Sequence, residues 1–180
     1  MKKEYIKDYV PDKDSDRGVR YVGEYYVTDI PDDKRRKDGL LQIVGAVVEI
    51  ILILIAVSLN CVGNYKVYIV IPMEIMLFCI LYYITGAYAY LKCDKRMEKL
   101  TYEKAFMRTV QSVTIAIIFN VFSLIGEAVL IIQNFKSLEG YGDYTFLIMI
   151  VLVLVINFFA FNRHRKLASQ VRQEQTEEKN

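Results

Sequence analysis

Four long apolar blocks constrain this chain more than any other feature of its sequence. They cover residues 39–59, 67–91, 110–132 and 144–162, and each is close to the ~20 residues that an α-helix needs to cross a hydrocarbon core of about 30 Å. Buried helices of a soluble bundle carry a polar face at the helical period, whereas these blocks hold only isolated polar residues. The sequence therefore predicts an all-α, polytopic membrane protein with four transmembrane helices in an antiparallel bundle.

The apolar blocks divide the chain into three parts. Residues 1–38 form a polar N-terminal tail, residues 39–162 the transmembrane domain and residues 163–180 a C-terminal tail. The first block is not a cleaved signal peptide, because it is longer than the roughly 7–15 apolar residues of such signals and follows a polar tail. That tail is too polar to bury a core of its own. However, its stretch "RYVGEYYVTDI" alternates and is rich in β-formers, which favours a short strand or hairpin arm lying on the membrane or on a partner.

Lys and Arg residues alternate strongly between the segments that flank the spans. The N-terminal tail holds ten, the first loop one, the second loop six, the third loop one and the C-terminal tail five. Because short segments rich in basic residues stay on the cytoplasmic side, we expect both termini and the second loop to be cytoplasmic in a plasma membrane.

The basic residues next to the spans also form a membrane anchor. The expected partners of this anchor are the lipid bilayer and anionic lipid head groups, and nucleic acid is not expected. The anchor consists of Lys34, Arg35, Arg36, Lys37, Arg163, His164, Arg165 and Lys166.

Three glutamates lie inside the predicted spans, with no Lys or Arg at the same depth: Glu49, Glu74 and Glu127. An ionised residue at the bilayer centre costs on the order of 2.5–3.5 kcal/mol, so each carboxyl should be neutral, hydrogen-bonded or in contact with water. Glu74 and Glu127 both lie in the outer half of the membrane, which allows them to face one another. Together with Asn120 and Asn157, the glutamates form a candidate intramembrane polar site.

Small and polar residues mark one face on each of two spans. Small residues let helices approach closely and polar residues hydrogen-bond between helices, so we expect both faces to be buried against other helices. The face on the third span consists of Ser112, Ala116, Asn120, Ser123 and Glu127, and the face on the first span of Gln42, Ala46, Glu49 and Ala56, with Ile53 between them.

Pro72 lies two residues before Glu74 in the stretch "VIPMEIM". Proline removes a backbone donor, so it should start or kink the second helix and free carbonyls near Val67 and Tyr68 that a side chain or water must satisfy. A carboxyl beside such an irregularity occurs in the cation sites of transporters, and it is also common in plain interhelical hydrogen bonding.

Known catalytic signatures are missing from the sequence. It contains no GxSxG, HExxH, GxxxxGK[ST] or GxGxxG motif. A single histidine, His164, gives no support to a zinc site, and Cys61, Cys79 and Cys93 fall at different predicted depths, which disfavours a disulfide. We therefore expect no enzyme, no metal and no cofactor.

Three stretches carry a resemblance to known proteins: "YVGEYYV", "VIPMEIM" and "KLTYEKAFMRTVQS". They resemble small four-span membrane proteins of Gram-positive gut bacteria. The resemblance covers most of the chain and implies a bacterial plasma membrane, but it brings no functional residues with it. Small multidrug transporters also have four spans and a membrane glutamate, although they are shorter and lack the long N-terminal tail.

Two functions from different classes fit these features. The first is a non-enzymatic accessory or interaction protein that works with a membrane-protein partner or as a homo-oligomer. The alternative is an oligomeric proton-coupled or cation transporter or channel that uses the intramembrane glutamates. The two differ in one physical property, because a transporter needs a carboxyl that water or a ligand can reach, whereas interhelical hydrogen bonding does not.

Overall fold

The structure, a computed structural model, describes residues 8–12, 18–135 and 141–174, so parts of both predicted tails lie outside the described residues. Four of its helices are long and apolar enough to cross a membrane, as the apolar blocks predict. In chain order, the four long helices are α1 (Asp32–Ser58), α2 (Val67–Lys92), α4 (Arg108–Asn134) and α5 (Gly142–Ala168).

Short elements precede and connect the long helices. The 3₁₀ turn η2 (Gly63–Tyr65) joins α1 to α2, and the short α3 (Lys99–Tyr102) and the π-helical segment η3 (Glu103–Met107) lead directly into α4. The strands are β1 (Tyr9–Pro11), β2 (Val19–Tyr21), β3 (Tyr25–Thr28), β4 (Arg96–Glu98) and β5 (Val171–Glu174). The fold is therefore mostly helical but not purely so.

The charged flanks of two predicted spans are helical as well. α1 begins at Asp32, directly after Pro31, and the aspartates of its first turn lie at the positive end of the helix dipole. α5 continues through the basic stretch "NRHRK" to Ala168. Each helix has 27 residues, which is about 40 Å at 1.5 Å per residue, so both are longer than a hydrocarbon core of about 30 Å.

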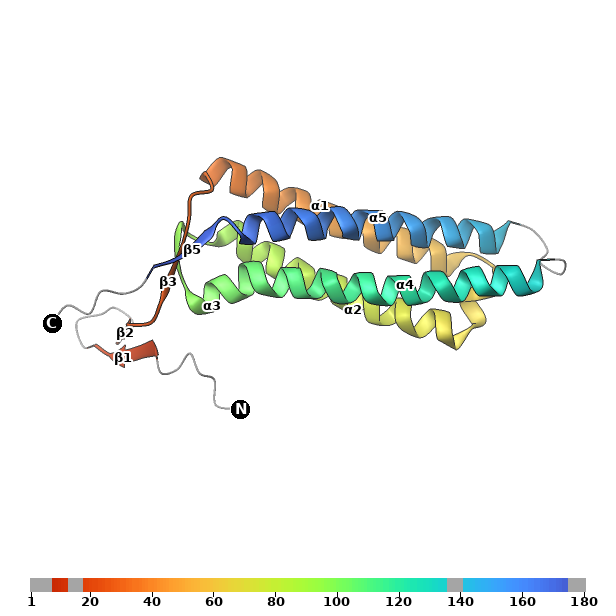
Figure 1. Cartoon of the computed structure of the whole chain (residues 1–180), viewed down its shortest axis with the longest axis horizontal. Helices are drawn as coiled ribbons and strands as arrows, with labels where there is room; N and C mark the ends of the chain where they lie inside the picture. Colours follow the sequence, from red (N-terminus) through yellow and green to blue (C-terminus); the bar gives the residue numbers. More distant parts are fainter. Residues whose placement is uncertain (1–7, 13–17, 136–140, 175–180) are drawn as a thin grey trace.

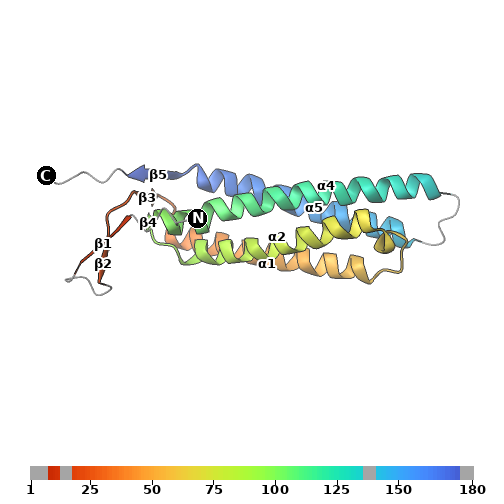
Figure 2. The same ribbon diagram turned by 90° about the horizontal axis from the view of Figure 1, so that it is seen from below.

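The four long helices lie side by side, and consecutive helices run in opposite directions (Figure 1, Figure 2). Contacts join α1 to α2, α2 to α4, α4 to α5 and α5 back to α1, so the helices enclose a common interior. The two predicted faces of small and polar residues are buried, which confirms that part of the sequence analysis. The buried residues are Ser112, Ala116, Asn120, Ser123 and Glu127 on α4, and Gln42, Ala46, Glu49, Ile53 and Ala56 on α1.

Large apolar side chains cover the outside of the helices. A soluble monomer rarely exposes an apolar patch of more than a few hundred Å². The outer surface of this chain is instead suited to contact with lipid on every long helix, as shown by the exposed residues Leu54 and Val57, Phe78 and Tyr82, Phe122 and Ile125, and Phe158 and Phe159.

A three-stranded antiparallel sheet lies at one end of the helices, which we call the sheet end (Figure 2). Its central strand β3 pairs with β4 from the segment between α2 and α4, and with β5 after α5; Tyr26, for example, lies opposite both Met97 and Gln173. The stretch "RYVGEYYVTDI" thus contains strands, as expected, but β3 pairs with two distant segments of its own chain. The strand β3, within the segment predicted to be a polar tail, is therefore part of a sheet with the rest of the chain.

The N-terminal hairpin of β1 and β2 lies close to β4. The Tyr9 hydroxyl donates a hydrogen bond to the Glu98 carboxylate, and the Tyr21 hydroxyl accepts one from the backbone N–H of Lys99 at 3.3 Å. The hydrogen bond to Glu98 and partial burial raise the pKa of Tyr9 to about 12. The hairpin is therefore tied to the segment between α2 and α4.

The opposite end of the helices, the loop end, carries η2. The Asn64 amide there donates hydrogen bonds to the carbonyls of Ala56, Val57 and Leu59, the shortest at 2.7 Å. These bonds satisfy carbonyls that the end of α1 leaves without an intrahelical donor. The first loop is thus fastened to the helix that it follows.

Candidate functional site

The three intramembrane glutamates have different surroundings. Glu127 is fully buried and Glu49 is only 3% exposed, whereas Glu74 is exposed on the outer surface of α2. Glu74 and Glu127 therefore do not face one another across the interior, contrary to what their similar depth suggested. The reason is the orientation of α2, which turns Met73 and Met76 inwards and Glu74 outwards.

Pro72 lies inside a continuous α2 and does not start it. Its missing N–H leaves the carbonyl of Tyr68 without the usual intrahelical donor. At the neighbouring carbonyl, that of Ile69, the Ser123 hydroxyl of α4 donates a hydrogen bond of 3.1 Å. This bond reaches the carbonyl next to the one that the proline frees, so compensation at Val67 and Tyr68 themselves stays a prediction.

Glu49 lines a cavity of about 300 Å³ between α1 and α5. Leu41 and Phe159, both exposed on the outside of the helices, belong to its lining, so the cavity opens on the outer side of the helices. The remaining lining residues are Gln42, Gly45, Ala46, Tyr83, Ile156, Ala160 and Arg163. A buried carboxyl is therefore reachable from the side of the molecule.

Glu49 and Gln42 lie two helical turns apart on α1 and both face this cavity. Neither side chain has a hydrogen-bond partner among the residues that the structure describes. Buried polar groups are normally satisfied, and an unsatisfied one calls for a structural explanation such as a ligand, an ion or water. The Gln42 amide is such a group, and the Glu49 carboxyl on the same cavity wall has no partner among the described residues either, so the wall points to an occupant that both would contact.

Tyr83 supplies an aromatic ring to the same cavity from α2. Its hydroxyl oxygen lies 3.0 Å from Nε2 of His164, and the two rings pack edge to face. His164 is 1% exposed, so its predicted role in the basic anchor is wrong: α5 remains helical past Asn162 and turns this side chain into the interior. The pair fixes the Tyr83 ring beside Glu49.

The other residues of the predicted anchor divide into two groups. Arg163 forms an ion pair with the buried Asp38 of α1, and Arg35 is itself buried, with Nη1 3.1 Å from Oδ1 of Asp32. Their charges therefore take part in packing the sheet end. The exposed members, which are free to contact head groups, are Lys34, Arg36, Lys37, Arg165 and Lys166.

Glu127 lies at the loop end, close to the carboxyl group of Asp143. The Gly63 N–H donates a hydrogen bond of 2.9 Å to Asp143, and a Cβ added at Gly63 would come within 3.0 Å of the Glu127 carboxyl carbon. Both Glu127 oxygens are buried without a hydrogen-bond partner among the described residues. Two carboxyls therefore meet here, well separated along the helices from Glu49.

The two candidate asparagines are buried in different surroundings. Asn157 lies beside a narrow gap that Glu49 and Ser112 also line, and its amide donates to the Val153 carbonyl at 3.1 Å. Asn120 is fully buried, and its amide has no hydrogen-bond partner among the described residues. The structure thus brings Asn157 close to Glu49, while Glu74 and Glu127 lie elsewhere.

Sequence reasoning missed Tyr83 as a neighbour of Glu49 and His164 as the partner of Tyr83. A usable signal exists on α5, because its buried residues recur at helical spacing into the basic stretch: Phe146, Ile150, Val153, Asn157, His164 and Leu167. No comparable signal identifies Tyr83, since α2 is apolar around its whole circumference.

The cavity combines a carboxyl, an amide and an aromatic ring in a mainly apolar lining, and its one cationic lining residue, Arg163, is paired with Asp38. No group of three or more metal-ligating side chains occurs within residues 8–12, 18–135 and 141–174. Such a site suits an apolar ligand with one positive charge, since the ring face and the carboxylate both attract cations. Comparison of the chain with protein-family models, curated proteins and solved structures found no match.

Proposed function

We propose that the chain is a non-enzymatic integral membrane protein of the plasma membrane, with its sheet end in the cytoplasm. The alternation of basic residues along the chain supports this orientation. Pairing of β3 with β4 and β5 agrees with it, because the N-terminal strand, the second loop and the C-terminal strand all lie at one end of the helices.

Cysteine labelling of intact cells tests this orientation. In a background without the native cysteines, Tyr65→Cys and Tyr141→Cys at the loop end should react with a membrane-impermeant maleimide added outside, because both positions are strongly exposed. Lys95→Cys at the sheet end should react only after lysis, since Lys95 is exposed at the end that we propose to face the cytoplasm. Labelling of position 95 alone in intact cells would reverse the proposed orientation.

The proposed function of the protein is located at the Glu49 cavity. There the protein binds a small lipophilic cation from the bilayer and releases a proton in exchange. The supporting observation is a buried carboxyl without a hydrogen-bond partner on a cavity that opens sideways. A carboxyl that merely joined helices would hold a donor or acceptor on a neighbouring helix. Glu49 holds neither among the described residues, so its position favours ligand binding.

The exchange follows from the cost of burying charge. An ionised carboxylate at this depth costs on the order of 2.5–3.5 kcal/mol without a counter-ion, so the empty cavity holds the neutral acid. A bound cation replaces the proton as the partner of Glu49, and the Tyr83 ring adds a second attraction for positive charge. Arrival of the cation and departure of the proton are therefore coupled.

Equilibrium binding of tetraphenylphosphonium to the purified protein tests the proposal. Glu49→Gln keeps the shape of the side chain but removes its charge, and it should weaken binding roughly thirtyfold or more, because loss of one partner of a buried charge pair costs about 2–5 kcal/mol. Glu74→Gln is the matched control, since Glu74 is exposed outside the cavity. Equal affinity of Glu49→Gln and the wild type would contradict cation binding at Glu49.

A specific observation supports a second candidate function, the accessory protein of the sequence analysis. β5 lies at the edge of the sheet and pairs only with β3 among the described strands, and Arg172, Gln173 and Glu174 are exposed. An open strand edge can accept a strand of a partner. This function predicts that Glu49→Gln leaves cellular activity unchanged, so the same variant separates the two candidates.

A further inference from the structure

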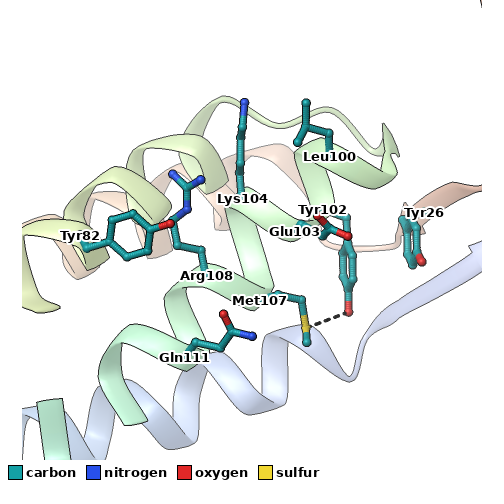
Figure 3. Close-up of a pocket in the computed structure, with 9 residues that line it drawn as sticks. All are labelled: Tyr26, Tyr82, Leu100, Tyr102, Glu103, Lys104, Met107, Arg108 and Gln111. Atoms are coloured by element: carbon teal, nitrogen blue, oxygen red, sulfur yellow. Dashed lines mark hydrogen bonds between the residues drawn. The ribbon is translucent and has the colours of Figure 1, made fainter. Parts of the chain in front are cut away.

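A second cavity, of about 460 Å³, lies on the outside of the helices at the sheet end (Figure 3). It forms where β3 and the α3–η3 segment meet α2 and the start of α4. Its lining consists of Tyr26, Tyr82, Leu100, Tyr102, Glu103, Lys104, Met107, Arg108 and Gln111. None of these residues lines the Glu49 cavity, so the two cavities are separate sites.

The lining brings two cations and one carboxylate together: Lys104, Arg108 and Glu103. None of the three belongs to an ion pair within the described parts of the chain, so their charges are not neutralised by the protein. The cavity therefore carries one net positive charge. This charge is complementary to a phosphate diester, which carries a single negative charge.

Contacts within the chain hold the Arg108 guanidinium in place. The group lies over the Tyr82 ring, 4.6 Å from the ring centre, and its Nη1 donates to the Thr85 hydroxyl at 3.4 Å. Arginine has five N–H donors, so several remain for a ligand. A guanidinium fixed on an aromatic face is well suited to bind phosphate oxygens.

Contacts within the chain also hold the tyrosines of the lining in place. The rings of Tyr26 and Tyr102 stack in parallel with their centres 4.2 Å apart, and the Tyr102 hydroxyl contacts the Met107 sulfur at 3.7 Å. Lys104 and Met107 belong to the π-helical segment η3. Isolated π-helical turns are frequent at functional sites, because the extra residue redirects side chains locally.

The depth of the cavity indicates which phosphate it meets. Arg108 is the first residue of α4, just before the apolar part of that helix, whereas Tyr82 and Met107 are exposed beside it as apolar surface. The lining thus changes from exposed apolar side chains to charged groups over a short distance. A bilayer changes in the same way where its acyl chains meet the head groups.

We infer that this cavity binds the head group of an anionic glycerophospholipid. Its phosphate contacts Arg108 and Lys104, the glycerol hydroxyls of a phosphatidylglycerol head group donate to Glu103, and the acyl chains lie along the exposed apolar side chains next to Tyr82. The inference depends on the proposed orientation only for the leaflet that supplies the lipid, and it is independent of Glu49.

Native mass spectrometry of the whole protein, released from mixed phosphatidylglycerol and phosphatidylcholine, tests this inference. The wild type should retain phosphatidylglycerol in preference to phosphatidylcholine, and Arg108→Gln should reduce that preference about fivefold, as expected for one basic side chain at an anionic surface. Arg165→Gln is the control, because Arg165 is an exposed basic residue of α5 outside the cavity. It should leave the preference unchanged.

A second variant and a competition experiment complete this test. If Arg108→Gln is poorly folded, Lys104→Gln replaces it, since the Lys104 side chain is exposed and forms no ion pair with the described residues. Millimolar glycerophosphate should not displace the lipid. Displacement of the lipid by this soluble phosphate would overturn the inference. So would a preference for phosphatidylglycerol that is equal in the wild type, Arg108→Gln and Lys104→Gln.

Discussion

Replacing Gly86 by leucine is expected to leave almost no folded protein, whereas replacing Gly45 by leucine is expected to leave the fold intact. A Cβ added at Gly86 would lie 2.5 Å from the Thr109 hydroxyl oxygen and 3.3 Å from the Lys104 carbonyl oxygen. At Gly45 an added Cβ would meet no atom within 4 Å. The two glycines therefore form a matched pair on neighbouring helices.

The magnitude follows from how tightly α2 packs against the start of α4. Overfilling a packed core by a few methylenes costs about 1–3 kcal/mol, and a leucine at Gly86 must also displace backbone. Small residues at such crossings are what allow helices in membranes to approach closely. Because Thr109 already donates to the Ala105 carbonyl at 2.9 Å, it cannot move away without losing a buried hydrogen bond.

Detergent extraction followed by size-exclusion chromatography and thermal melting measures the outcome. Gly86→Leu should give little monodisperse protein and Gly45→Leu a normal peak with a melting temperature close to that of the wild type. A normal yield and melting temperature for Gly86→Leu would contradict this close packing of α2 against η3 and the start of α4.

The sequence was most informative where polar residues mark a face. On α4, five small or polar residues at helical spacing identified the buried side correctly, and on α1 the same signal placed Gln42 and Glu49 inside. On α2 the pattern gives no such face, because its residues are apolar all round. The orientation of Glu74 could therefore not be predicted, and packing against α4 turns it outwards.

The pairing of β3 with strands far away in the chain could not be predicted from the sequence, for a different reason. β3 has the β-branched and aromatic residues of a strand, but β4 reads "RME" and β5 reads "VRQE", which carry little strand preference of their own. They become strands because the ends of α2 and α5 bring them beside β3. The same helical extension of α5 brings His164 to Tyr83, where a basic flank had suggested a surface residue.

Coupled proton release is the second large effect that the structure leads us to expect. Binding of tetraphenylphosphonium to the wild type should release about one proton per bound cation, because a group that changes its protonation state on binding links the two equilibria. Gly45→Leu places a side chain in the lining of the Glu49 cavity without disturbing its backbone neighbours. It should therefore reduce cation binding and proton release together, in a protein that remains folded.

The decisive measurement is the pH change of a weakly buffered solution of the purified protein when tetraphenylphosphonium is added, with Glu49→Gln and Glu74→Gln beside the wild type. The wild type and Glu74→Gln should release about one proton per bound cation, and Glu49→Gln should release none, because glutamine has no proton to exchange. Proton release by folded Glu49→Gln equal to that of the wild type, or cation binding by the wild type without any release, would contradict a proton-exchanging site at Glu49.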